Sequence, residues 1–210
     1  MDLLLSGKSP VADVADGEIA KQLGDTYFVG TGYGVVADCS IVIVCVPTPL
    51  DDQGKPDISH LLKAVDGIAG VMSSGSLLII ESTIEPGTIR EVIAPKVPGA
   101  EVVYSPERID QGNKTWTVKN TPKLVAGLSK AGGDKAAAFY STFISDVRVV
   151  SSVEVIETAK LLENSFRLVN ISFINEISIL CDAMGIDVQE VIAAASSKPY
   201  GFMPFYPSAG

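Results

Sequence analysis

Short apolar runs alternate with amphipathic stretches over the first 150 residues of the chain. The apolar runs predict strands at 40–46, 76–81, 101–104, 123–127 and 147–150. The stretches between them predict helices at 57–73, 87–94 and 133–145, the last one after a break at Gly132-Gly133. Strands that alternate with helices are typical of a parallel βαβ sheet, so the fold class is α/β. In such a sheet the β-branched run at 40–46 is expected to be buried on both faces.

The pattern changes near residue 150, where we expect a domain boundary. Residues 152–184 contain neither glycine nor proline and are followed by Gly185, which predicts one long helix that ends at this glycine. Such a helix is far longer than the mean of about 11 residues in globular proteins. A shorter helix at about 187–195 and a tail rich in proline and aromatic residues at 198–210 follow.

Composition and charge favour a globular protein and argue against a membrane protein or a nucleic-acid-binding protein. Hydrophobic residues make up 47% of the chain and charged residues 20%, which is typical of a globular protein. The longest apolar run, Ser40–Val46, is too short to span a bilayer, and Met1–Ser9 lacks the features of a signal peptide. The formal net charge of -9 argues against a nucleic-acid partner.

The cysteines and the histidine exclude two further classes. The three cysteines show no paired spacing and there is one histidine, which argues against a disulfide framework and against a His/Cys metal site. We expect a cytoplasmic protein without membrane or metal. Cys45 and Cys181 lie within predicted elements and are interpreted as inert core thiols.

Polar residues follow three predicted strands at the point where each strand ends. Pro47-Thr48-Pro49 follows the first strand, Ser82-Thr83 the second, and Ser105-Pro106-Glu107-Arg108 the third. In an open parallel sheet, ligands bind beyond the carboxyl ends of the strands. The alternative is that these residues only terminate strands, which explains one such segment well and three together poorly.

A polar stripe runs along the predicted long helix. Glu157, Lys160, Asn164 and Arg167 are spaced so that they share one face, and Asn175 returns to it. The other faces are mostly apolar, so the stripe is expected to face a partner, a cavity or a ligand. A solvated stripe with a Glu157–Lys160 pair, worth a few tenths of a kcal/mol, is the alternative. A lysine in a partly buried cleft can stabilise an alkoxide or act as a base.

One glycine-rich segment resembles a phosphate-binding loop only superficially. Gly30 to Gly34 carries three glycines, but a predicted strand follows it where a helix N-terminus is required. We interpret the segment as a turn.

Five segments resemble, in order and spacing, the UDP-glucose/GDP-mannose dehydrogenase family. Four of them are VCVPTPLDDQGKPD (44–57), ESTIEPGT (81–88), YSPER (104–108) and ETAKLLENSFRLVNISFINE (157–176). The tail KPYGFMPFYPSAG (198–210) looks most like the branch that acts on UDP-N-acetylhexosamines or their uronic acids. The resemblance covers nearly the whole chain.

The resemblance implies a two-step, four-electron oxidation of a sugar C6 alcohol to a carboxylate with two NAD, in nucleotide-sugar and polysaccharide biosynthesis. It implies that Lys160 and Asn164 stabilise the developing oxyanion. Thr83 would help position the hydrolytic water near the nicotinamide, and Glu107 would act as acid and base. Thr48 and Thr83 match cofactor contacts. The residues that match substrate contacts are Glu107, Arg108, Ile109, Lys160, Asn164, Arg167, Phe205 and Tyr206.

Parts of the family pattern are missing from these 210 residues. The opening βαβ unit with its GxGxxG turn would precede Met1, and the nucleophilic cysteine would follow Gly210. Ser208-Ala209 stands where a Gly-Pro pair is usual. The resemblance therefore implies a fragment that is inactive alone: a partial Rossmann-like NAD-binding domain at 1–150 and the start of a helical central, dimerisation domain at 151–210. A homodimer through the 152–184 helix is expected.

Two other classes of function stay open. β-Hydroxyacid dehydrogenases share the Rossmann domain, the long helix and a Lys-x-x-x-Asn pair, and they need no cysteine. The VPTP, SPER and FYP segments fit a nucleotide-sugar enzyme better. The third possibility is a non-catalytic dimerisation module.

Overall fold

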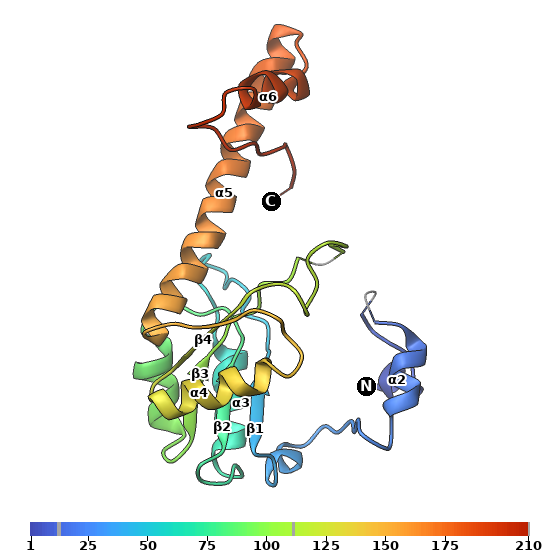
Figure 1. The fold of residues 1–210 in the computed structure, drawn as a ribbon, viewed down its shortest axis with the longest axis vertical. Coiled ribbons are helices and arrows are strands. Elements are labelled where there is room, and N and C mark those ends of the chain that lie inside the picture. The colour runs from blue at the N-terminus through green and yellow to red at the C-terminus, as the bar shows by residue number, and fades with distance from the viewer. Residues whose placement is uncertain (12–13, 111, 210) are drawn as a thin grey trace. The chain divides into compact units, whose positions relative to one another are not determined.

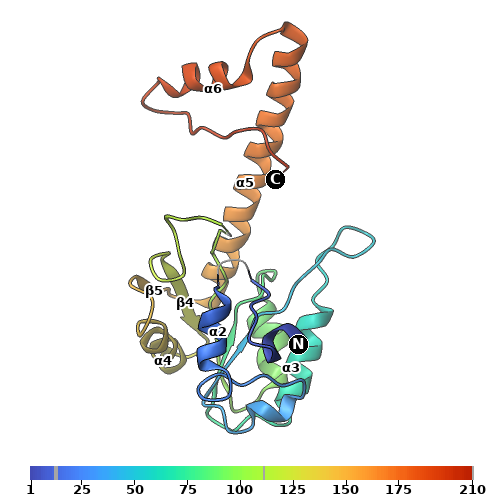
Figure 2. The same cartoon turned by 90° about the vertical axis from the view of Figure 1, so that its right-hand side faces the viewer.

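The computed structural model describes residues 1–11, 14–110 and 112–209 of the chain. These residues form two compact units, Met1–Thr158 and Ala159–Gly210. The first unit is a mixed α/β layer structure and the second is helical (Figures 1 and 2).

A five-stranded sheet forms the centre of the first unit. Its strands lie in the order β1-β2-β3-β4-β5. The bounds of the strands are β1 Ile41–Val44, β2 Leu77–Ile80, β3 Glu101–Tyr104, β4 Lys123–Gly127 and β5 Val147–Val149. All five overlap the strands that the apolar runs predict.

One pairing in this sheet differs from the predicted parallel arrangement. β1, β2 and β3 are parallel, and so are β4 and β5, but β4 runs antiparallel to β3. A parallel crossover needs a connection that returns the chain to the other end of the sheet, usually through a helix. The described residues between Tyr104 and Lys123 contain no helix or strand, so β4 begins near the edge at which β3 ends.

Helices cover both faces of the sheet, as Figure 2 shows with α3 and α4 on opposite sides. α3 (Ser59–Ala69) joins β1 to β2. Its buried apolar residues recur at helical spacing and form one face: Leu61, Ala64, Val65 and Ile68. The π-helix η2 (Ile89–Ile93) and the 3₁₀ helix η3 (Ala94–Lys96) replace the single helix predicted at 87–94, and η2 joins the same core. α4 (Lys130–Tyr140) packs on the other face, where Ala136 and Tyr140 contact the second core cluster.

The glycine pair at 132–133 lies inside α4 and does not precede it, which corrects the predicted start at residue 133. A Cβ on Gly127 of β4 would lie 2.4 Å from the backbone nitrogen of Gly133, and one on Gly132 would lie 3.0 Å from Glu101 Oε2. These glycines allow the first turn of the helix to lie directly against the sheet.

Strand β1 is not buried on both faces, contrary to the prediction. It is the edge strand of the sheet, and its Ile43 side chain is 38% exposed. α4 packs on β2, β3, β4 and β5. This explains why the same face of β1 is more open to solvent.

Three short helices precede β1 in the part of the chain that the structure describes. They are α1 (Asp2–Leu5), α2 (Asp16–Gln22) and the 3₁₀ helix η1 (Tyr33–Val36). η1 directly follows Gly32 and leads into β1, so the glycine-rich segment forms a turn before a strand, as interpreted.

The long helix α5 (Val153–Met184) begins in the first unit and continues through the second. It ends at Gly185, whose φ of 69° suits a glycine at the end of a helix. In the second unit α6 (Val188–Ser196) is capped by the Asp187 side chain, which accepts a hydrogen bond from Gln189 N at 2.9 Å. No helix among the described residues is long and apolar enough to cross a membrane.

Candidate active-site edge of the sheet

Two hydrogen bonds join the segment that follows β1 to the segment that follows β2. Ser82 Oγ accepts from Val46 N at 3.0 Å and donates to Val46 O at 2.8 Å. Thr48 and Thr83 come directly after this junction, the first half-buried and the second exposed. We call the side of the sheet at which β1, β2 and β3 end the carboxyl edge. Two of the three predicted segments thus meet there through a buried serine.

The third segment, which follows β3, lies at the same edge. Ser105 is fully buried and donates to Leu124 O at 2.8 Å, while Glu107 N donates to Glu81 O at 3.3 Å. Glu107 Oε1 accepts from the backbone nitrogens of Arg108 and Ile109, both at 2.6 Å. The carboxylate of Glu107 therefore holds the backbone that directly follows it, and its side chain is 50% exposed.

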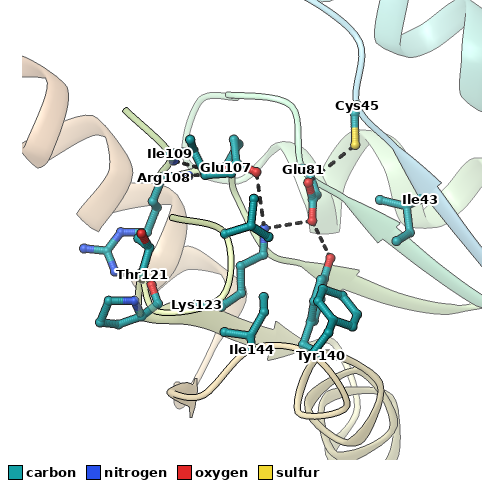
Figure 3. A pocket seen from close by; sticks show the side chains of 13 residues that line it. Ile43, Cys45, Glu81, Glu107, Arg108, Ile109, Thr121, Lys123, Tyr140 and Ile144 are labelled. Atoms are coloured by element: carbon teal, nitrogen blue, oxygen red, sulfur yellow. Dashed lines mark hydrogen bonds and ion pairs between the residues drawn. The ribbon is translucent and has the colours of Figure 1, made fainter. Parts of the chain in front are cut away.

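A pocket of about 290 Å³ opens beside this segment, as Figure 3 shows. Glu107, Arg108 and Ile109 line one side of it, and Arg108 Nη1 is held by a 2.9 Å hydrogen bond to Pro122 O. Ile43 and Phe143 contribute apolar walls. Three of the residues predicted to contact substrate therefore line one cavity.

The floor of the pocket is a network of buried polar groups. Lys123 Nζ donates to Glu81 Oε1 at 2.7 Å, and the two side chains are only 8% and 12% exposed. The hydroxyl of Tyr140 donates to the same carboxylate oxygen, and Lys123 Nζ lies 5.0 Å from the centre of the Tyr140 ring. Burial, and then the hydrogen bond to Glu81, raises the pKa of the Tyr140 hydroxyl.

Cys45 belongs to this network, which corrects its interpretation as a core thiol. β1 ends at Val44, so Cys45 lies beyond the strand and is exposed. Its Sγ lies 3.4 Å from Glu81 Oε2. Burial of the sulfur, followed by the charge of Glu81, raises the pKa of the thiol to about 12. Cys181 is buried, as predicted.

Glu81, Lys123 and Tyr140 were not among the residues that sequence patterns single out. Glu81 opens the ESTIEPGT segment, but it is also the last residue of a predicted apolar run. Lys123 is a charged residue at the start of another such run. A charge at the boundary of a buried strand is a weak signal for a buried ion pair, because it also suits a solvent-exposed strand end.

Glu157 lies in a different place from the one that the polar stripe suggests. The residue is fully buried, and its two carboxylate oxygens accept from Gly87 N at 2.7 Å and from Ile89 N at 3.0 Å. These amides begin η2, where a carboxylate also interacts favourably with the helix dipole. Because Glu157 is buried and binds these amides, the alternative interpretation of Glu157 as part of a solvated pair with Lys160 is wrong.

The second unit holds the remaining predicted site residues. Lys160 and Asn164 on α5 are half-buried, and Arg167 is exposed. The tail folds along α5, where the amide of Asn175 exchanges two hydrogen bonds with the Ser208 backbone. The Phe205 ring lies edge-on to that of Phe166 with their centres 5.7 Å apart, and the adjoining Tyr206 is exposed.

The carboxyl edge offers hydroxyl groups that suit a bound dinucleotide, but within the described part of the chain it lacks the usual binding site for the pyrophosphate. Thr48 and Thr83 offer hydroxyl groups beyond β1 and β2, where such a ligand lies in sheets of this type. A pyrophosphate is normally bound at the N-terminus of a helix that follows a glycine-rich turn. Gly30 to Gly34 leads only into the four residues of η1 and then β1, so the described residues provide no such site there. No group of three or more potential metal ligands occurs among the described residues.

Comparison with known proteins shows partial similarity to longer enzymes. The chain is 37% identical over 179 residues to the UDP-N-acetyl-D-glucosamine 6-dehydrogenase of Pseudomonas aeruginosa, covering 80% of this chain and 42% of that protein. It is 30% identical over 215 residues to the UDP-N-acetyl-D-mannosamine dehydrogenase of Salmonella typhimurium, covering 95% and 51%. The chain thus spans about half the length of the curated relatives that it matches.

A solved structure and two family models agree with this similarity. The UDP-D-ManNAc dehydrogenase of Pyrococcus horikoshii superposes with a TM-score of 0.81 at 28% identity, over 95% of this chain and 51% of that one. Residues 2–144 match the NAD binding domain of the UDP-glucose/GDP-mannose dehydrogenase family, and residues 154–210 match its central domain. Since two consecutive domain models of one family account for most of its residues, the chain belongs to the NAD-dependent UDP-glucose/GDP-mannose dehydrogenase family.

Proposed function

We propose that this chain is part of an NAD-dependent dehydrogenase that oxidises the C6 alcohol of a UDP-N-acetylhexosamine, or another UDP-hexose, to the carboxylate. The observation that carries the proposal is the meeting of the VPTP, EST and SPER segments at the carboxyl edge, in a chain that both family models match. Each of the two steps removes two electrons and uses one NAD, and water supplies the second carboxylate oxygen.

The first unit supplies the cofactor side of this reaction. Thr48 and Thr83 would contact NAD, and Thr83 would also orient the attacking water; its exposure at the carboxyl edge supports both roles. NAD, when bound, accepts hydride from the sugar carbon. Glu107 would transfer protons as a general acid and base, and its half-exposed carboxylate beside the pocket supports that role.

The second unit supplies the groups that stabilise charge. Lys160 and Asn164 would stabilise the oxyanion, since an ammonium and an amide donor on one helix face can both point at a single oxygen. Arg108, Ile109 and Arg167 would contact the substrate. Phe205 and Tyr206 would begin a loop over it, and the attachment of the tail to α5 through Asn175 and Phe166 supports that placement.

The organisation of the chain is part of the same proposal. We assign 1–150 to an incomplete NAD-binding domain and 151–210 to the start of a central domain that forms a homodimer through the 152–184 helix. The exposed apolar side chains of α5 support the dimer, because isolated helices seldom leave so many in water. A cytoplasmic location is proposed from the cysteine pattern, with neither nucleic acid nor membrane as a partner.

A chimera tests the proposed roles of the site residues. The part of this chain that aligns with the Pseudomonas aeruginosa relative, 80% of its length, would replace the matched region of that protein, so that the cofactor loop and the nucleophilic segment come from the relative. We expect Lys160→Ala and Glu107→Gln to lower kcat by roughly 100-fold or more, as the loss of an oxyanion donor or a general acid does. Lys96→Ala, which removes a surface ion pair with Asp66, is the control and should leave kcat unchanged. Full activity of both site variants in a folded chimera would refute the assignment.

A further inference from the structure

The network below the pocket contains a buried lysine that none of the proposed roles uses. Lys123 is the first residue of β4, and because β4 runs antiparallel to β3, this residue lies at the carboxyl edge. In a parallel strand the first residue would lie at the opposite edge. The reversed direction of β4 therefore brings an ammonium group to the edge where β2 and β3 end.

Two carboxylates meet this ammonium group. Lys123 Nζ lies 2.7 Å from Glu81 Oε1 and 4.0 Å from Glu107 Oε2, and it also donates to Pro106 O at 3.4 Å. Figure 3 shows the lysine between the two acids. Glu81 and Glu107 are close neighbours, since their backbones share a 3.3 Å hydrogen bond. Two negative charges at such a partly buried edge repel each other, and a cation between them offsets the repulsion.

The contacts of Glu107 connect this charge to the backbone of the segment that follows β3. One carboxylate oxygen of Glu107 accepts from the amides of Arg108 and Ile109, and the other faces Lys123. The ammonium group also contacts the carbonyl of Pro106, the residue before Glu107. Lys123 thus interacts with this segment through both the backbone of Pro106 and the side chain of Glu107.

We propose that Lys123 is a positioning residue for Glu107. Its ammonium group neutralises Glu81 and holds the Glu107 carboxylate in the orientation in which it accepts the two amides. The inference rests on the proposed acid–base function of Glu107, but the orientation itself can be measured without any reaction. The competing account is that Lys123 serves only as the ion-pair partner of Glu81.

The amide signals of Arg108 and Ile109 report this orientation directly in the 210-residue chain. A carboxylate acceptor shifts an amide proton downfield, so Glu107→Ala, which has no side-chain acceptor, defines the size of the signal change when the acceptor is lost. We expect Lys123→Met to cause most of that change and to add little to it in the Glu107→Ala background. Lys96→Met, which removes a 2.8 Å surface ion pair, should leave both amides in place. Unchanged Arg108 and Ile109 signals in a folded Lys123→Met chain would overturn the proposal.

A second variant distinguishes the positioning role of Lys123 from a role only as the ion-pair partner of Glu81. It is also needed because Lys123→Met leaves Glu81 buried without this partner, which could unfold the chain. Replacing a whole buried ion pair by apolar residues is often neutral for stability. We therefore combine Glu81→Met, Lys123→Met and Tyr140→Phe, which removes the network and leaves Glu107 intact. Loss of the two downfield amide signals in this variant supports the positioning role. Their retention shows that Lys123 acts only through Glu81. Because neither NAD nor sugar is present, failure here is distinct from failure of the proposed function.

Discussion

Cys45 shows how its neighbours decide the chemistry of an accessible side chain. The thiol lies at the mouth of a pocket, yet its Sγ is 3.4 Å from the Glu81 carboxylate. Burial and then this charge raise its pKa to about 12, whereas the thiolate is the form that attacks an electrophile. At neutral pH Cys45 therefore carries its proton, and it is a poor candidate for the nucleophile that the proposed reaction requires.

The raised pKa predicts slow alkylation of Cys45 that depends on Glu81. The rate with iodoacetamide should rise with pH up to about 12, where the thiolate becomes the main form. Glu81→Gln removes the second-largest cause of the shift, lowers the pKa and should accelerate the reaction at pH 8.5 by roughly threefold to tenfold, because one pKa unit changes the thiolate fraction about tenfold. Peptide mass spectrometry measures the rate.

Glu85→Gln is the matched control for that experiment. Glu85 is an exposed acid in the segment that follows β2, and it does not contribute to the raised pKa of Cys45. Equal Cys45 rates in wild type and Glu81→Gln would show that the carboxylate does not control the thiol.

The positions of some candidate site residues in the fold could be predicted from sequence, and those of others could not. Thr48, Thr83 and Glu107 follow apolar runs, and the rule for parallel sheets places them at one edge. The same rule assigns Lys123 to the wrong edge, because nothing in the run KLVAG indicates that its strand is reversed. Cys45 was predicted to lie inside the strand at 40–46, because the apolar run continues past it. The hydrophobic pattern does not fix where a strand ends.

Among the elements, the start of α5 depends on a buried acid. Glu157 is fully buried and caps the first turn of η2 through Gly87 and Ile89, and Arg90 on η2 pairs with Glu154 on α5 at 2.6 Å. The helical pattern predicts the length of α5 from its glycine-free run. It cannot reveal that one residue of the polar stripe binds backbone amides about 70 residues earlier in the chain.

Glu157→Gln should therefore destabilise the fold more than a change at a surface acid. An amide side chain can accept one of the two backbone hydrogen bonds, but its NH₂ group meets the other donor. We expect a loss of about 1–3 kcal/mol in the free energy of unfolding, the cost of a buried group left unsatisfied. Urea denaturation followed by circular dichroism measures it.

Glu154→Gln provides the comparison for Glu157, since it removes an exposed ion pair one turn earlier on the same helix. Exposed pairs contribute at most about 1 kcal/mol, so this variant should stay close to wild type. If both variants lose the same stability, the two hydrogen bonds of Glu157 have no special importance.

At the scale of the whole molecule, the second unit exposes several large apolar side chains. Leu162, Leu168 and Val169 of α5 are each more than 60% exposed. The helix has apolar residues on several faces, and such helices are buried in stable proteins. The exposed residues account for the proposed homodimer, for which a second copy of α5 offers a surface of the same character.

The dimer makes a prediction for the isolated chain. Light scattering at micromolar concentration should give twice the chain mass of 22.0 kDa, and Leu162→Glu combined with Val169→Glu should shift the chain toward the monomer. Gln189→Glu adds a charge at an exposed position of α6, outside the proposed dimer helix, and is the control for charge alone. A wild-type monomer under these conditions would contradict the proposed dimer.

The central claim, that these residues belong to a nucleotide-sugar 6-dehydrogenase, is tested most directly by counting the NADH formed per sugar. The chimera with the Pseudomonas aeruginosa relative is mixed with NAD and a limiting amount of UDP-N-acetylglucosamine or UDP-N-acetylmannosamine. We predict about two NADH per UDP-sugar consumed, since the family reaction removes four electrons, and negligible NADH from the 210-residue chain alone. A folded chimera that oxidises neither UDP-sugar, or that instead oxidises a small 3-hydroxyacid, would contradict the assignment to a nucleotide-sugar 6-dehydrogenase.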